Sequence, residues 1–96
     1  MKLVTDRPDD DEPAEIAGQA LLFLAADAER LGTFLALSGL DPRRIREAAR
    51  DPAFLVGVLD HLLNDEGLLL SFAAESGVRP QRVAEVRARM AGPQIH

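Results

Sequence analysis

The sequence contains no cysteine, tryptophan or tyrosine, and phenylalanine occurs four times. The absence of cysteine excludes disulfides and thiolate metal sites as sources of stability or catalysis. Long apolar runs are also lacking, because the longest ones, residues 20–26 and 67–70, are far too short to span a bilayer. Met1 is followed by Lys2 and then by acidic residues, not by an apolar signal region. We therefore expect a cytoplasmic protein that has no membrane segment.

The length and the distribution of charge indicate one small domain with an acidic N-terminal end. The chain has 96 residues, 47% of them hydrophobic, which is ordinary for a globular domain. Its formal net charge is −5, and five of its 16 acidic residues lie within the first twelve positions. We expect an acidic flexible tail over residues 1–12, one helical domain over residues 13–92 and a flexible C-terminus over residues 93–96.

A thirty-residue segment occurs twice, because residues 21–50 align without a gap to residues 59–88 at an offset of 38. Eleven aligned positions are identical, far more than chance predicts, so internal duplication is the better explanation. The identical pairs are Leu21/Leu59, Leu24/Leu62, Asp27/Asp65, Leu31/Leu69, Phe34/Phe72, Ala36/Ala74, Ser38/Ser76, Gly39/Gly77, Pro42/Pro80, Arg44/Arg82 and Glu47/Glu85. Shared residues indicate one structural unit, and positions that differ indicate where a function was added.

Helix start and stop signals recur along the whole chain. Four prolines suit the first helical position, four aspartates suit N-caps and two glycines suit helix ends. They are Pro13, Pro42, Pro52 and Pro80; Asp27, Asp41, Asp51 and Asp65; and Gly39 and Gly77. The predicted helices span about 13–26, 28–38, 42–50, 52–63, 65–76 and 80–91. The predicted fold is all-α, a compact bundle of five or six helices made of two pseudo-repeated three-helix units, about 13–50 and 52–91.

The two units are expected to share one core, because a single unit of this size buries too little apolar surface to fold alone. Leu31 and Phe34 follow helical spacing in the first copy, as do Leu69 and Phe72 in the second. We predict that these four residues form the centre of the shared core.

The second copy contains a segment that resembles a helix-turn-helix motif. Ala73, Gly77 and Val83 have the spacing of that motif's small residue, turn glycine and buried aliphatic residue. The candidate nucleic-acid contacts are Arg79, Gln81, Arg82, Arg87 and Arg89, within a region of about residues 68–90.

A simple helical corner explains the same pattern, which recurs in the first copy at Leu35, Gly39 and Ile45. The sequence pI of about 4.9 also disfavours nucleic-acid binding. The arrangement of the arginines discriminates between the two interpretations, because dispersal among Asp41, Glu47 and Glu85 would argue against a nucleic-acid surface.

Catalytic and metal-binding patterns are weak in this chain. His61 and Asp65 lie four residues apart, but a metal site needs further ligands, and Asp65 is already expected to cap a helix. Ser38, Ser71 and Ser76 have no evident histidine and acid partner, and no glycine-rich phosphate loop occurs. We expect no enzyme activity, no metal and no cofactor.

The two copies differ at apolar positions that suggest a partner surface. Leu68 and Leu70 replace Arg30 and Gly32 of the first copy. Leu22 and Phe23 of the first copy are likewise replaced, by Asp60 and His61 in the second. One interpretation is that the extra apolar groups pack the two halves together. The other is a surface for a homodimer or another protein, because successive helical residues lie about 100° apart and Leu68 and Leu70 cannot share one narrow stripe. We predict that one of these two leucines is substantially exposed.

Two stretches resemble a family of short alpha-proteobacterial proteins catalogued as domain of unknown function 3572. The first stretch runs from Phe23 to Pro42 and the second from Asp51 to Phe72, with Val58 to Glu66 the most specific part. The resemblance covers about residues 13–92. It implies an all-helical bacterial cytoplasmic protein and assigns no catalytic residue.

Overall fold

The computed structural model describes residues 8–91, and for residues 8–12 it describes the backbone only. Within this range the chain forms six α-helices, one short 3-10 helix and no strand. The elements are α1 (Pro8–Ala25), α2 (Ala28–Ser38), η1 (Pro42–Arg44), α3 (Ile45–Ala48), α4 (Pro52–Leu63), α5 (Glu66–Ser76) and α6 (Pro80–Ala91). The predicted all-α fold is confirmed.

Local capping interactions explain why most helix bounds match the prediction. The carboxylate of Asp27 accepts hydrogen bonds from the backbone N–H groups of Glu29 and Arg30, at 2.9 and 3.2 Å. Asp65 caps α5 in the same way, accepting from the backbone N–H of Leu68 at 3.1 Å. Asp41 and Asp51 also accept a backbone N–H two residues ahead. These bonds satisfy N–H groups that have no partner within the helix, so these four helices begin directly after an aspartate.

Both predicted helix-ending glycines adopt the left-handed conformation. Gly39 has φ 75° and Gly77 has φ 78°, and their N–H groups bond to the carbonyls of Leu35 and Ala73. The preceding serines reinforce these ends. Ser76 Oγ donates to the carbonyl of Phe72 at 2.7 Å and accepts from the N–H of Val78 at 3.1 Å. The duplicated serines thus have a local structural role at helix ends.

Three of the six predicted helices have different bounds in the structure. Helix α1 begins at Pro8 and not near residue 13, so residues 8–12 belong to the helix instead of the expected tail, and Pro13 lies inside it. Pro8 suits a first helical position, and acidic residues are favourable in a first turn. The rest of the expected tail, residues 1–7, and the expected C-terminus, residues 93–96, lie outside the described residues. Helix α5 begins one residue late, at Glu66.

The third difference is the helix predicted over residues 42–50, which is split into η1 and α3 and ends at Ala48. The N–H groups of Arg50 and Asp51 bond three residues back, to the carbonyls of Glu47 and Ala48, and so close a tight turn. Asp51 must then be extended to precede Pro52 and to cap α4, which prevents the helix from continuing.

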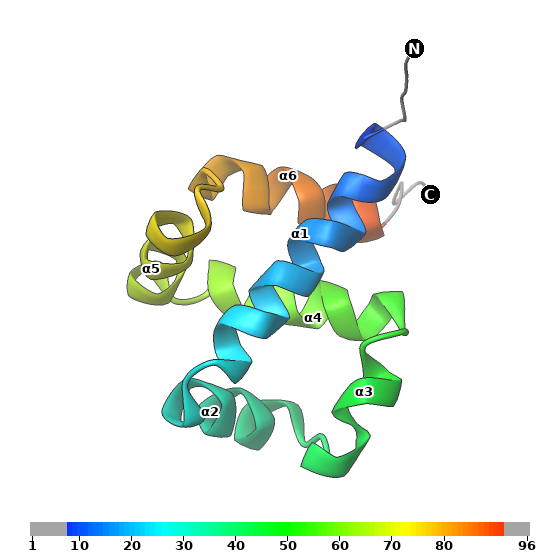
Figure 1. The fold of residues 1–96 in the computed structure, drawn as a ribbon, viewed down its shortest axis with the longest axis vertical. Coiled ribbons are helices and arrows are strands. Elements are labelled where there is room, and N and C mark those ends of the chain that lie inside the picture. The colour runs from blue at the N-terminus through cyan, green and yellow to red at the C-terminus, as the bar shows by residue number, and fades with distance from the viewer. Residues whose placement is uncertain (1–7, 92–96) are drawn as a thin grey trace.

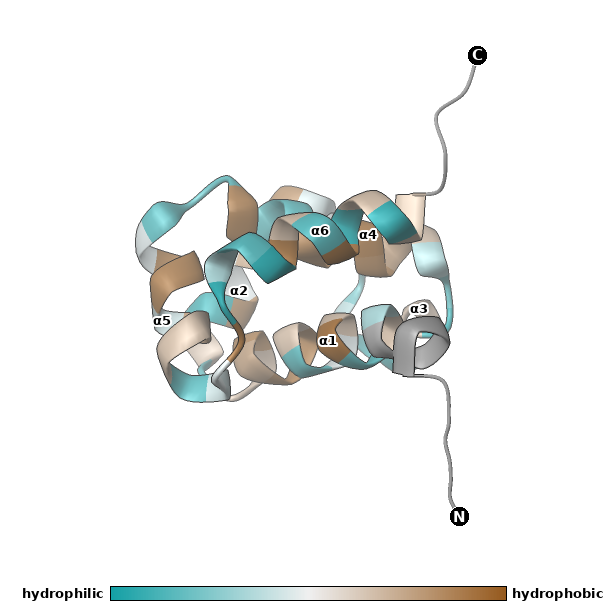
Figure 2. Ribbon diagram, turned by 90° about the horizontal axis from the view of Figure 1, so that it is seen from above, coloured by the Kyte–Doolittle hydropathy of each residue, from teal (hydrophilic) through white to brown (hydrophobic). Residues whose placement is uncertain are grey.

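Helices α1, α4 and α6 pack against one another and form the centre of the bundle. Figure 1 shows α1 crossing α4, with α5 and α6 above the crossing and α2 and α3 below it. Seen from above, α1 forms one layer and α4 with α6 the other (Figure 2). The largest fully buried side chains come mainly from these three helices: Leu24, Val58, Leu59, Leu62, Val83 and Val86, with Phe72 from α5.

The predicted core centre is therefore half right. Phe34 and Phe72 are buried, but Leu31 and Leu69 are only half-buried. Helices α2 and α5 lie at the periphery and present only one edge to the core, which the phenylalanines fill.

The aligned segments 42–48 and 80–86 are packed unequally. Val83 is fully buried, whereas Ile45 at the aligned position is half-buried. The reason is that α6 has 12 residues and packs against both α1 and α4, while α3 has only four.

Candidate interaction surface

The four residues nominated from the sequence as partner contacts lie in different environments. Leu22 is 70% exposed and Leu70 is 51% exposed. Leu68 is half-buried and packs against the core. Phe23 is buried, with its ring edge-on to Phe72 at a centroid distance of 5.4 Å, and therefore presents little surface to a partner. Leu70 is thus the exposed one of the two leucines specific to the second copy.

Leu70 lies on the outer face of α5. Phe72 points into the core, and at about 100° per residue Leu70 and Ala74 fall on the opposite side of the helix. Gly67, Leu70 and Ala74 are all exposed on this side. Glu66 lies four residues before Leu70 and is also exposed, so this side of α5 places one leucine and two small residues next to a carboxylate.

Leu37 on α2 is a further exposed leucine that the sequence analysis missed. It is 74% exposed, and no other large apolar side chain with described burial exceeds this value. It follows Phe34 by three residues, a spacing typical of one buried stripe. One sequence signal did point outward, since the aligned residue of the second copy is the charged Glu75.

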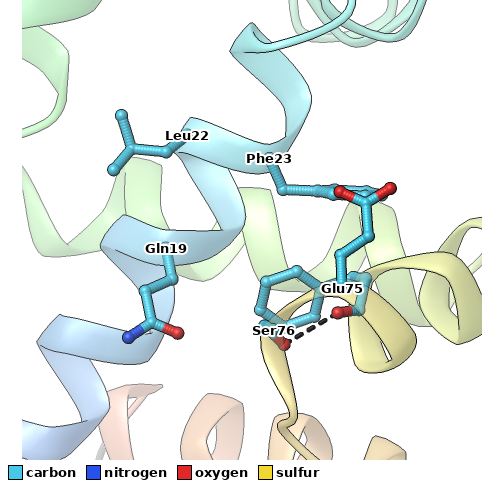
Figure 3. Close-up of a pocket in the computed structure, with 6 residues that line it drawn as sticks. Gln19, Leu22, Phe23, Glu75 and Ser76 are labelled. Atoms are coloured by element: carbon cyan, nitrogen blue, oxygen red, sulfur yellow. Dashed lines mark hydrogen bonds between the residues drawn. The ribbon is translucent and has the colours of Figure 1, made fainter.

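A hollow of about 370 Å³ lies between α1 and α5. We call it the Leu22 hollow; its lining residues are Gln19, Leu22, Phe23, Phe72, Glu75 and Ser76. Figure 3 shows Phe23 pointing toward Glu75 on α5 and Leu22 pointing away from α5. The buried aromatic rings of Phe23 and Phe72 thus contribute to a depression at whose edge Leu22 is exposed.

A second, larger depression of about 520 Å³ involves α2, the end of α4 and the start of α5. We call it the Leu37 groove; its lining residues are Asp27, Glu29, Arg30, Thr33, Leu37, His61, Asn64, Asp65 and Leu68. It combines two leucines with three carboxylates, one histidine and one guanidinium. Both helix-capping aspartates of the duplicated segment lie in it.

Arg30 connects the two depressions. Its guanidinium carbon lies 4.1 Å from the centre of the Phe23 ring, a cation–π geometry. Its Nη2 atom also lies 3.7 Å from a carboxylate oxygen of Glu75. Arg30 lines the Leu37 groove while Glu75 lines the Leu22 hollow, so their ion pair lies between the two.

Most of the residues considered for metal binding and catalysis have structural roles. The His61 ring packs edge-on against Phe34 at 5.1 Å, and Asp65 caps α5. Among residues 13–91, no group of three or more histidine or acidic side chains is arranged to hold a metal ion. The hydroxyls of Ser38 and Ser76 bond to backbone at their helix ends.

Several arginines, including the nominated nucleic-acid contacts Arg82 and Arg87, are paired with carboxylates. Arg82 bonds Glu85 at 3.1 Å, and Arg44 bonds Glu47 at 3.1 Å. Arg87 on α6 makes two hydrogen bonds to Asp60 on α4, at 2.7 and 3.2 Å, and this carboxylate raises the pKa of the guanidinium. These cations are therefore dispersed among acids.

Arg43 completes this set, with hydrogen bonds to Asp41 at 3.3 and 3.0 Å that lower the pKa of the Asp41 carboxyl. The other nominated contacts, Arg79, Gln81 and Arg89, lie on or just before α6, and all three are exposed. The structure does not gather the nominated arginines on a face free of acidic residues.

Residues 10–93 match the protein family described as "Protein of unknown function (DUF3572)". The chain belongs to this family. No curated protein and no solved structure matches the chain. In this DUF3572 protein, none of the helices within residues 8–91 has the length and apolar character needed to cross a bilayer.

Proposed function

We propose that this DUF3572 protein is a non-catalytic, cytoplasmic protein-interaction module that binds a partner or a second copy of itself at the Leu22 hollow. The carrying observation is that Leu22 is 70% exposed and lines a hollow whose other apolar lining residues, Phe23 and Phe72, are buried. A domain of this size needs all the apolar burial available to it. A leucine left largely exposed at the edge of a depression therefore favours a partner that covers it.

The non-catalytic part of the proposal is supported by the engagement of the candidate catalytic groups. Ser38 and Ser76 use their hydroxyls at helix ends, and the His61 ring packs on Phe34. A catalytic serine needs a base within hydrogen-bond reach. Neither serine has a histidine among its hydrogen-bond partners described above.

A nucleic-acid-binding regulator was the alternative drawn from the helix-turn-helix-like segment. It has less support, because Arg82 and Arg87 are paired with Glu85 and Asp60 and the chain is acidic. Nucleic-acid affinity depends mainly on cations that neutralise phosphates. Salt-sensitive, micromolar or tighter binding to mixed duplex DNA at low salt would reverse this preference.

Two assays on the wild-type chain and its Leu22→Arg variant test the interaction module directly. In the first, each tagged protein captures binding proteins from an extract of the cells that naturally make this chain. In the second, light scattering measures self-association. We expect a protein, or a second copy, that binds the wild-type chain and is lost with Leu22→Arg. Ala84→Arg is the matched control, because it adds the same charge at an exposed helical position outside the Leu22 hollow.

Thermal unfolding should be nearly the same for all three proteins, since both substituted side chains are exposed. If neither self-association nor any retained protein distinguishes Leu22→Arg from Ala84→Arg, the Leu22 hollow is not a partner site.

A further inference from the structure

The Leu37 groove presents apolar side chains beside an excess of negative charge. Leu37 is largely exposed and Leu68 is half-buried, so both retain apolar surface that the fold does not cover. The carboxylates of Asp27, Glu29 and Asp65 line the same groove. Apolar surface of this kind is stabilised by an apolar occupant, and its acidic surroundings favour an occupant that is also cationic.

The one guanidinium in the groove, that of Arg30, already interacts with two residues outside the groove. Arg30 lies over the Phe23 ring at 4.1 Å and 3.7 Å from Glu75, which lines the Leu22 hollow. The groove therefore has three carboxylates and one guanidinium, and this guanidinium also pairs with Glu75 outside the groove. A cationic side chain from a partner would meet a net negative surface.

Comparing the two aligned copies indicates where in the groove a partner's cation would lie. In one copy, the Phe23 ring packs edge-on against Phe72, with an interplanar angle of 67°, and Arg30 covers it. In the other copy the aligned ring is His61, which packs edge-on against Phe34 at 68°. The residue aligned with Arg30 there is Leu68, which carries no charge. The second ring pair thus has the geometry of the first but lacks the arginine.

We propose that the Leu37 groove binds a segment of a partner protein in which an aliphatic side chain stands next to an arginine or lysine. The aliphatic side chain packs between Leu37 and Leu68, and the cation lies near His61 and pairs with Glu29 and the capping aspartates. This inference rests on the proposed interaction function and specifies the partner's chemistry at a second surface.

The test uses a fluorescent helical peptide of leucine, alanine and arginine, with two comparison peptides. One has glutamate in place of arginine and the other has serine in place of leucine. Fluorescence anisotropy at low salt measures their affinities for the full chain. We expect only the peptide that contains both leucine and arginine to bind well, because each comparison removes one half of the match.

Two pairs of variants distinguish binding in the Leu37 groove from general electrostatic attraction to an acidic protein. Leu37→Ser should weaken binding about tenfold, because a leucine that becomes buried on binding is lost. Leu70→Ser is its matched control on the outer face of α5 and should leave the affinity unchanged. Glu29→Gln should weaken binding about threefold. Glu47→Gln removes the same charge at an exposed site outside the groove and should have no such effect.

Each contrary result overturns the groove assignment. Equal binding of the arginine and glutamate peptides excludes a cationic occupant. Equal effects of Glu29→Gln and Glu47→Gln show attraction to net charge alone, and an unchanged affinity of Leu37→Ser shows that the peptide binds elsewhere. A partner lost with Leu22→Arg but retained by Leu37→Ser would leave the interaction function standing while removing this groove from it.

Discussion

Three helical leucines are buried to different depths, and truncating each to alanine measures where the core lies. Leu62 on α4 is fully buried, Leu31 on α2 is half-buried and Leu37 on α2 is largely exposed. All three lie inside α-helices, where leucine and alanine have similar propensities. Differences in stability among the three variants therefore report burial.

The expected losses follow from the surface that each side chain buries. Leu62→Ala should cost about 3–4 kcal/mol, within the range for fully buried leucines, because α1, α4 and α6 cannot collapse freely around the missing methyl groups. Leu31→Ala should cost about 1–2 kcal/mol, since part of its surface already contacts water. Leu37→Ala should change the free energy of unfolding by less than about 0.5 kcal/mol.

Urea unfolding followed by far-ultraviolet circular dichroism is the suitable assay, because the chain has neither tryptophan nor tyrosine for fluorescence. With a slope of about 1.5 kcal/mol per molar urea, a loss of 3 kcal/mol lowers the midpoint by about 2 M. Equal losses for Leu62→Ala and Leu31→Ala would refute the placement of the core between α1, α4 and α6. A loss for Leu37→Ala as large as that for Leu31→Ala would show that Leu37 is covered.

Three further predictions follow from helix ends, charge and the shared core. Gly77→Ala should lower the free energy of unfolding by about 1 kcal/mol, because the backbone φ at this position is 78°. Gly67→Ala, inside α5, should raise it by about 0.5–1 kcal/mol, because alanine favours the helix more than glycine does. Urea midpoints that move in the same direction for both variants would contradict this. Arg43 lowers the pKa of Asp41 below its ordinary value of 3.8, so the folded chain binds that proton less readily than the unfolded chain. The resulting stability is complete above that value and lost as the pH falls below it, so Asp41→Asn should lose less stability than wild type in acid unfolding from about pH 4 to about pH 2. Residues 1–50 alone should not melt cooperatively by circular dichroism, because α1 packs against α4 and α6; a cooperative transition would refute the shared core.

The candidate surface was only partly predictable from the sequence. Comparison of the two copies drew attention to Leu22 and Leu70, and both are exposed. The same comparison nominated Phe23, which is buried because α5 brings Phe72 against its ring and Arg30 covers it. Leu37 was overlooked, since its helical spacing from Phe34 resembles that of a buried residue. Which residues line a depression depends on the approach of helices that are distant in the sequence.

Helix positions were determined by the sequence itself. Helix α2 matches its predicted bounds, and α4 and α6 do so as well. The reason is that a cap involves only residues two to four positions apart: Asp27 bonds to Glu29 and Arg30, and Gly39 bonds back to Leu35. Such bonds form whatever surrounds the helix, so residue type and spacing are sufficient to locate them.

Burial was decided only by the tertiary structure. Leu31 and Leu62 are both leucines with helical apolar spacing, yet one is half-buried and the other has no contact with water. The aligned Ile45 and Val83 differ in the same way. In each case the deeper residue lies on α4 or α6, which pack against each other and against α1, and the shallower one lies on a peripheral helix. Local spacing places a residue on a face of its helix, but the number of helices that cover this face is a property of the whole bundle.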